Sequence, residues 1–297
     1  MRVAVTGSSG LIGQALLPAL KAAGHETIAL VRRPPNRGEA QWDPAAGRLD
    51  PAAIQGIGAA INLAGENIAT RWTEESKRRI RESRIQATTL LATTMASLAR
   101  RPETLLSVSA VGLYGDRGDE VLTEASAAGE GFLPALAREW EAAAGPAGIA
   151  GIRVVHPRMG IVLSDKGGAL DKMLTPFKLG VGGRMGSGEQ WMSWIALDDV
   201  VAGFLYLLNT PSLRGPVNFT APAPIRNKDF TRELGRALHR PTIFPVPTPA
   251  LQLLYGKEMP AEALLSSARV IPEALIKQGF SFKFRELGPA LEKMLRK

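Results

Sequence analysis

The sequence predicts an α/β fold in which a doubly wound, mainly parallel sheet carries helices on both faces and is joined by a small C-terminal lobe. Three observations predict it. Short β-branched runs that end at small residues alternate with longer stretches of helical periodicity. A glycine cluster separates the first such run from the first helical stretch. The chain has 297 residues, 45% of them hydrophobic, which is enough for a large core without cross-links.

The first unit is a strand, a helix and a second strand. Residues 2–6 (RVAVT) are expected to form a buried strand, and apolar residues then recur at helical spacing between 16 and 20. Gly24 stands where a glycine typically ends a helix, and residues 25–31 (HETIALV) are expected to form the second strand.

Three glycines, Gly7, Gly10 and Gly13, occupy the turn between that first strand and its helix. Because glycine has no side chain, backbone N–H groups in such a turn can approach a diphosphate, which the N-terminus of the helix also attracts. A tight turn alone would also use glycines, but it would not explain their combination with two flanking strands. We therefore expect this turn to bind the diphosphate of a dinucleotide.

Arg32 and Arg33 end the second strand, where a dinucleotide-binding fold places the residue that meets the adenosine ribose. An acidic residue there would bind the 2′-hydroxyl of NAD(H), whereas two guanidinium groups attract the 2′-phosphate of NADP(H). We expect NADP(H). The alternative is a solvated basic pair ahead of the turn at Pro34 and Pro35.

The remaining elements are expected in the same alternating order. Further strands are expected at residues 58–63, 105–109 and 216–220, and residues 153–163 are expected to form a strand plus a loop. A helix is expected to begin at Thr73, with Ser76 and Lys77 in its first turn. Another helix is expected over 170–179. A further helix is expected to begin at Asp198 and Asp199, which are expected to cap it. The C-terminal region is expected to contain two helices separated near Gly256. Residues 34–56 are expected to form a surface loop.

Two features of the C-terminal half have open interpretations. The glycine-rich residues 180–188 are either a substrate lid or a connector. Trp191 and Trp194 would form a stacking surface if exposed, and core packing, which we favour, if buried.

Composition excludes several function classes. The chain has no cysteine, hence no disulfide or thiolate nucleophile, and its three histidines are far apart, so no metal site is expected. Its apolar runs are shorter than the roughly 18 residues of a membrane span, and no secretory signal pattern is present, so we expect a cytoplasmic protein without a membrane partner. The net charge of +8 is dispersed, which favours a pocket for an anionic ligand over a nucleic-acid surface.

The glycine spacing, T-G-x-x-G-x-I-G, resembles the extended, epimerase-type branch of the short-chain dehydrogenase/reductases, which have a Rossmann-type sheet. That resemblance implies a catalytic Tyr-x-x-x-Lys pair and a serine or threonine that holds the substrate oxygen. This chain departs from the pattern, because the corresponding positions hold Ala110, Leu133 and Ala137.

One subfamily resembles the chain in these losses as well. Its signatures are similar to N-L-A-G-E-N-I at 62–68, S-A-V-G-x-Y-G at 109–115, W-E-x-A-A at 140–144, R-x-G-I-V-L at 158–163 and W-x-S-W-I-x-L-D-D at 191–199. These are the epimerase-family (39U-type) proteins, NAD-dependent epimerase/dehydratase-like, which end in a domain of unknown function. Where that family shows His, this chain has Ala196.

The predicted site residues fall into two sets. Cofactor-binding residues lie in the glycine turn, at the end of the second strand and after the two next strands: Thr6, Gly7, Ser9, Gly10, Leu11, Ile12, Gly13, Arg32, Arg33, Leu63, Ala64, Gly65 and Ser109. The candidate catalytic residues are Tyr114, Glu66 and Arg158, with Tyr114 first and with Arg158 or Lys77 as the cation beside its phenol.

The resemblance divides the chain into a dinucleotide-binding core over 1–165, completed by 190–222, and a substrate lobe with the C-terminal module over 166–189 and 223–297. We expect hydride transfer, of oxidoreductase or epimerase type, on a small carbonyl or sugar-like substrate. The alternative is a non-catalytic NADP(H)-binding redox sensor or cell-division-associated module. A homo-oligomer is compatible with the sequence.

Overall fold

A central parallel sheet organises the molecule, whose computed structural model describes residues 1–296. Its strands run in the order β13 (Gly215–Phe219), β9 (Arg153–Met159), β6 (Thr104–Ser107), β5 (Ala59–Asn62), β1 (Arg2–Thr6), β2 (Glu26–Val31), β3 (Glu39–Asp43) and β4 (Arg48–Leu49). Every pair is parallel except β3 with β4, and the short β7 (Ser109–Ala110) adds to β9. The strand order reverses between β1 and β5, so the predicted doubly wound sheet is confirmed.

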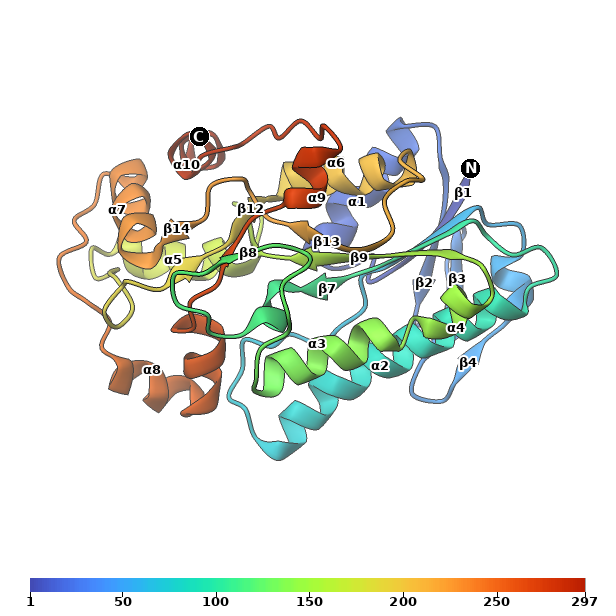
Figure 1. Ribbon diagram of the computed structural model, residues 1–297, viewed down its shortest axis with the longest axis horizontal. Coiled ribbons are helices and arrows are strands. Elements are labelled where there is room, and N and C mark those ends of the chain that lie inside the picture. Colours follow the sequence, from blue (N-terminus) through green and yellow to red (C-terminus); the bar gives the residue numbers. More distant parts are fainter. Residues whose placement is uncertain (297) are drawn as a thin grey trace.

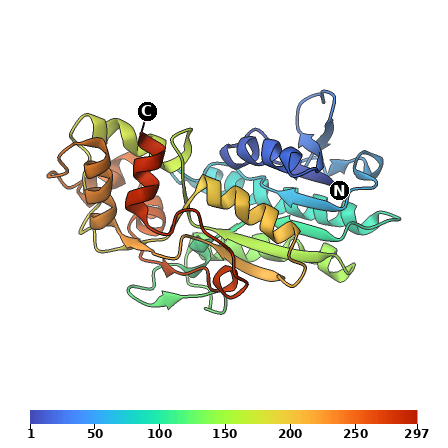
Figure 2. The same cartoon turned by 90° about the horizontal axis from the view of Figure 1, so that it is seen from above.

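Helices cover both faces of this sheet (Figures 1 and 2). On one face lie α1 (Leu11–Ala22), α6 (Leu197–Leu208) and the short α9 (Glu273–Lys277). On the other lie α2 (Glu74–Ser97), α3 (Phe132–Ala142) and α4 (Gly145–Ile149). Two clusters of buried apolar side chains, one on each side of the strands, hold these three layers together.

One expected loop contains regular structure. Within residues 34–56 the chain adds β3 and β4 to the sheet edge and ends in a short 3-10 turn, η1 (Pro51–Ile54). The reason is apolar burial, because Ala40, Trp42 and Leu49 pack under the sheet beside α2. The expectation of a surface loop here was therefore wrong.

The C-terminal lobe is built around its own apolar cluster. Its helices are α5 (Gly168–Lys178), α7 (Asn227–Leu238), α8 (Thr248–Tyr255), a π-helical turn η3 (Pro260–Leu264) and α10 (Leu287–Leu295). Small ladders join it to the core: β10 (Ile161–Leu163) with β12 (Trp194–Ala196), β11 (Trp191–Met192) with β14 (Ile225–Arg226), and β8 (Val121–Leu122) with β15 (Arg269–Val270). Trp194 is completely buried in this cluster, as the core interpretation predicted, whereas Trp191 is half-buried and lies outside it, so the interpretation was wrong for Trp191.

The last part of the chain returns to the core, which differs from the expected division at residue 223. Leu275, Phe280 and Phe282 pack in the sheet cluster beside α6. Asp199 fixes this return, because its carboxylate accepts hydrogen bonds from the backbone N–H groups of Lys283 (2.7 Å) and Phe284 (3.0 Å). The side chain of Asp199 therefore ties two distant segments together and does not cap its own helix.

The start of α2 agrees with its sequence signal. The Thr73 side chain accepts a hydrogen bond from Ser76 N–H, and the Ser76 hydroxyl accepts one from Thr73 N–H, a reciprocal capping box. In the part of the chain that the structure describes, no helix is both long and apolar enough to cross a membrane.

Candidate functional site

The glycine turn links the carboxyl end of β1 to α1, and its three glycines serve different needs. Gly7 has a positive φ of 64°, and a Cβ there would lie 2.7 Å from the carbonyl oxygen of Leu63. A Cβ on Gly13 would lie 2.4 Å from the Gly7 carbonyl oxygen. Gly10 is exposed, and its nearest neighbour would be 3.4 Å away. The fold thus requires Gly7 and Gly13, whereas Gly10 leaves open the space in front of the helix.

The N-terminus of α1 has no side-chain partner within residues 1–296. No side chain caps it, and its first turn, which includes Leu11, Ile12 and Gly13, contains no acidic residue. Ser9 is exposed in the turn, where its carbonyl accepts a hydrogen bond from the Gln14 side chain (2.8 Å). Free N–H groups and the helix dipole favour a negative group in front of α1. The chain therefore fits a dinucleotide diphosphate here.

Thr6 differs from its expected role as a cofactor ligand. Its side chain is completely buried, its hydroxyl donates to Asn62 Oδ1 (2.7 Å), and it accepts from the N–H groups of Leu63 (3.0 Å) and Ala64 (3.2 Å). Thr6 therefore holds the turn after β5 against the end of β1. It fixes the position of Leu63, Ala64 and Gly65 from inside the protein.

The two arginines after β2 are not equivalent. Arg33 forms a two-pronged ion pair with the Glu39 carboxylate (2.6 and 2.7 Å), and this pairing raises the pKa of Arg33 and lowers that of Glu39. Arg32 is exposed, and within residues 1–296 it forms no ion pair. Of these two arginines, Arg32 is the one whose charge is uncompensated in the described residues.

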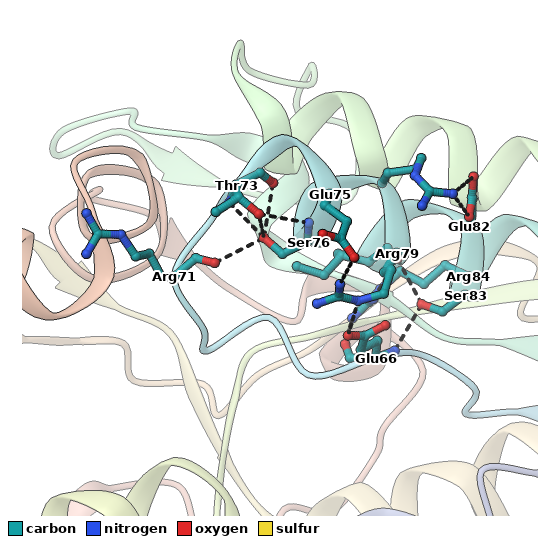
Figure 3. Close-up of polar contacts among 11 residues, drawn as sticks. Glu66, Arg71, Thr73, Glu75, Ser76, Arg79, Glu82, Ser83 and Arg84 are labelled. Atoms are coloured by element: carbon teal, nitrogen blue, oxygen red, sulfur yellow. Dashed lines mark hydrogen bonds and ion pairs between the residues drawn. The ribbon is translucent and has the colours of Figure 1, made fainter.

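Glu66 lies in the loop after β5, among basic residues of α2 (Figure 3). Its carboxylate lies 3.3 Å from Arg79 Nε, and its backbone N–H donates to the Ser83 hydroxyl (3.0 Å). Its carbonyl oxygen accepts a hydrogen bond from Arg84 (2.9 Å). The Glu66 side chain stays 40% exposed, so its carboxylate is held in place yet accessible at the carboxyl edge of the sheet.

Tyr114 and Arg158 do come together, but inside the protein. The Tyr114 side chain is completely buried, its hydroxyl donates to Asn218 Oδ1 (2.7 Å), and Arg158 donates to that hydroxyl (3.0 Å). Arg158 also forms a two-pronged pair with Glu141 (2.8 and 2.9 Å). Lys77, the other cation considered, contacts Glu74 and Glu258 instead.

Electrostatics also argue against a proton-transferring role for this phenol. Burial raises the pKa of Tyr114 despite the neighbouring Arg158, so the hydroxyl stays protonated. Burial alone would raise the pKa of Glu141, but the Arg158 pair lowers it below its usual range. The geometry gives Tyr114 and Arg158 a structural role, in place of the expected catalytic one.

Ser109, predicted to bind the cofactor, lies inside the protein. It is buried, and its register against Arg158 puts both side chains on the α3 side of the sheet. Its hydroxyl has no hydrogen-bond partner within residues 1–296, although it is near enough to help lower the pKa of Glu141. A contact of Ser109 with a cofactor stays a prediction.

Two residues at this site were missed from the sequence. The Glu262 carboxylate, from the C-terminal module, accepts hydrogen bonds from the backbone N–H groups of Phe132 (3.0 Å) and Leu133 (2.8 Å) at the start of α3. Arg84 lies under Gly65. A sequence signal for Arg84 existed, because it falls at helical spacing on the buried stripe that includes Ile80, Ala87, Thr88 and Leu91.

A cavity of about 440 Å³ lies between the core loops and the lobe. Its lining includes Asp119, Gln190 and Arg226. Beside it the Trp191 ring is stacked between the guanidinium groups of Arg226 (4.7 Å) and Arg269 (4.5 Å). The neighbouring glycine loop is hydrogen-bonded to residue 246 in both directions, which agrees with a connector. No group of three or more metal-ligating side chains occurs in the described residues.

Two family models match the chain. The model described as the NAD dependent epimerase/dehydratase family matches residues 3–137, and a domain of unknown function, DUF1731, matches residues 246–294. Epimerase family protein Mb2239 of Mycobacterium bovis is 45% identical over 291 residues, which cover 97% of this chain and 96% of that protein. Human epimerase family protein SDR39U1 is 36% identical over 299 residues, or 99% and 100% of the two chains.

Solved structures of epimerase-family proteins are also similar to this chain. Human SDR39U1 (isoform2), crystallised with NADPH, has a TM-score of 0.91 and 35% identity, and the match covers 99% of each chain. A nucleoside-diphosphate sugar epimerase from Corynebacterium glutamicum has a TM-score of 0.83 and 38% identity over 99% of this chain and 58% of that one. The UDP-glucose 4-epimerase of Thermus thermophilus, with 17% identity and a TM-score of 0.78 over 99% and 98% of the chains, shares the fold alone.

Proposed function

The chain belongs to the epimerase family, and from this premise we propose that it binds NADP(H) and transfers hydride to or from a small carbonyl or sugar-like substrate. One observation carries the proposal. The uncapped, acid-free N-terminus of α1 faces the space that Gly10 leaves open, at the point where the strand order reverses. Dinucleotides bind at such a switch point in open α/β sheets. The NADPH bound by the human relative supports the choice of cofactor.

The preference for the phosphorylated dinucleotide rests on Arg32. Its guanidinium is uncompensated, whereas that of Arg33 is paired with Glu39. A 2′-phosphate would supply the missing negative charge at the end of β2, and a guanidinium binds phosphate with paired hydrogen bonds.

When bound, the nicotinamide supplies or accepts the hydride, and this chain must move the accompanying proton. The usual tyrosine and lysine are replaced by Leu133 and Ala137, and Tyr114 is buried with both hydroxyl contacts made inside the protein. Glu66 is the candidate that keeps an accessible carboxylate at the carboxyl edge, where Arg79 holds it. We assign it the proton transfer, and we assign the substrate to the cleft between core and lobe.

The first test is isothermal titration calorimetry of the purified full chain with NADPH and NADH. We expect heat for both, with NADPH at least roughly tenfold tighter, because an ion pair with the 2′-phosphate is worth at least about 1.4 kcal/mol. Absence of heat for either dinucleotide would refute the proposed cofactor site.

The second test concerns Glu66. With NADPH bound, oxidation is followed at 340 nm against a panel of small aldehydes, ketones and keto-sugars. Glu66→Gln keeps the hydrogen-bonding shape but removes the base, so turnover should fall on the order of 10²-fold or more while NADPH affinity stays unchanged. Glu75→Gln, which removes the other carboxylate paired with Arg79, is the matched control. Unchanged turnover in Glu66→Gln would remove the residue from the chemistry.

A non-catalytic NADP(H) sensor is the second candidate function. The observation that favours it is the loss of all three usual catalytic positions beside an intact diphosphate site. Tight NADPH binding without turnover on any member of the panel would favour the sensor over the enzyme.

A further inference from the structure

Arg84 carries a positive charge that the protein leaves without a negative partner. Its two terminal nitrogens donate to backbone carbonyl oxygens, those of Ile80 (3.0 Å) and Glu66 (2.9 Å). Within residues 1–296 it forms no ion pair, because the nearby Glu66 carboxylate is held by Arg79. Burial lowers the pKa of Arg84 to about 10, so the group stays charged at neutral pH. A partly buried cation whose partners are neutral is costly to hold, so a ligand that brings negative charge or further acceptor oxygens would be favoured there.

The position of Arg84 in the sequence of α2 places it near the carboxyl edge of the sheet. One turn further along the helix, the Thr88 hydroxyl accepts a hydrogen bond from the side chain of Asn62, the last residue of β5 (2.8 Å). Arg84 therefore lies one turn above the end of that strand. It also lies directly under the turn after β5, since a Cβ on Gly65 would be 3.1 Å from the Arg84 guanidinium carbon.

Across the sheet, Arg84 lies toward α3, the side to which the nicotinamide half of a bound dinucleotide would extend. Arg84 stacks on the ring of Trp140 in α3 (5.0 Å), and the Trp140 N–H donates to Thr88 (3.0 Å). Ala137 precedes Trp140 by one turn of the same helix. The adenosine half of a dinucleotide extends from β1 toward β2, where Arg32 lies, so the other half extends toward β5, β6 and α3.

We propose that Arg84 is a cofactor-binding residue that supplies, from α2, the positive charge on the nicotinamide side that Ala137 cannot supply from α3. This inference rests on the proposed NADP(H) site. A purely structural arginine would not discriminate between the oxidised and the reduced cofactor. The oxidised nicotinamide ring carries a positive charge and the reduced ring does not, so Arg84 repels the oxidised form and makes the site prefer NADPH over NADP⁺.

The test compares three ligands on the full chain: NADPH, NADP⁺ and 2′,5′-ADP, which lacks the nicotinamide half. Wild type should bind NADPH roughly tenfold more tightly than NADP⁺, since one nearby charge in a partly buried site has about this effect. Arg84→Gln should bring the ratio of the two dissociation constants close to one and leave the affinity for 2′,5′-ADP within twofold of wild type. Arg84→Lys keeps the charge and should retain most of the preference.

The outcomes separate this inference from the cofactor proposal. If 2′,5′-ADP and both dinucleotides fail to bind wild type, the cofactor site itself is wrong. If they bind but Arg84→Gln keeps the wild-type ratio of NADP⁺ to NADPH affinity, the role of Arg84 is overturned. A uniform loss for all three ligands in both variants, with a lowered melting temperature, would show that Arg84 only supports the fold, and would overturn it as well.

Discussion

One ion pair gives the neighbouring arginines Arg32 and Arg33 different net charges in their surroundings. Because Glu39 already neutralises Arg33, removing the charge of Arg33 changes the field at the end of β2 less than removing that of Arg32. The sequence alone placed both residues at the ribose end of the site, since a carboxylate six positions further along is not recognisable as a partner until β3 pairs with β2.

We predict that Arg32→Asp weakens NADPH far more than NADH. The new carboxylate repels the 2′-phosphate but can accept a hydrogen bond from a 2′-hydroxyl. The affinity ratio of NADPH to NADH, measured by calorimetry, should fall by on the order of 10²-fold. Arg100→Asp, an exposed arginine between α2 and β6 at the opposite edge of the sheet, is the charge-matched control. An equal loss of both dinucleotides in Arg32→Asp would contradict the 2′-phosphate assignment.

At the scale of the element, the turn before α1 separates a folding requirement from a binding requirement. Gly13 is buried in the first turn and must pass close to the Gly7 carbonyl, whereas Gly10 has ordinary extended angles and open space. The two glycines look equivalent in the sequence, and only the packing distinguishes them.

We therefore predict opposite outcomes for two substitutions in this turn. Gly10→Val should keep the wild-type melting temperature within a few degrees and lose NADPH binding, because the new side chain fills the place of the diphosphate. Gly13→Ala should lower the free energy of unfolding by about 1–3 kcal/mol, because its Cβ overlaps backbone atoms. Thermal melting and calorimetry on both variants check this. A Gly10→Val variant that binds NADPH normally would place the diphosphate elsewhere.

Helix α2 illustrates what periodicity can and cannot predict. Its start at Thr73 follows from a local capping pattern and was predicted correctly. Most of its arginines, such as Arg79 and Arg81, are exposed, yet Arg84 lies on the inner stripe and stacks on Trp140. The stripe is visible in the sequence, but its partner on α3 is 56 positions away and depends on how the helices pack.

At the scale of the whole molecule, the doubly wound parallel sheet and the glycine turn before α1 were predictable because each strand and its following turn carry local signals. Arg158 was predicted beside Tyr114, but the burial of this pair was not predictable, because it depends on Asn218 and Glu141 from two other elements. The same holds for the buried return of the chain after residue 269, which depends on Asp199 meeting a segment more than 80 positions later. Local patterns predict elements, whereas burial of a polar side chain is decided by distant ones.

His156 gives this packing a pH dependence. It lies on β9 beside Glu141 and Arg158, its Nδ1 has no hydrogen-bond partner within residues 1–296, and burial lowers its pKa. In the unfolded chain a histidine takes up a proton near pH 6.5. Below that pH the unfolded state binds a proton that the folded state does not, so stability falls as pH falls. The Glu141 carboxylate, with its lowered pKa, stays ionised across this window.

We predict that the free energy of unfolding decreases by on the order of 1 kcal/mol between pH 7.5 and pH 5, through His156 alone. His156→Leu should remove this decrease, since leucine fills much of the same volume and does not titrate. His239→Asn, at an exposed position with a φ of 52° that asparagine tolerates, should keep it. Urea unfolding of the three proteins at both pH values measures the difference. An equal decrease in wild type and His156→Leu would place the titrating group elsewhere in the molecule.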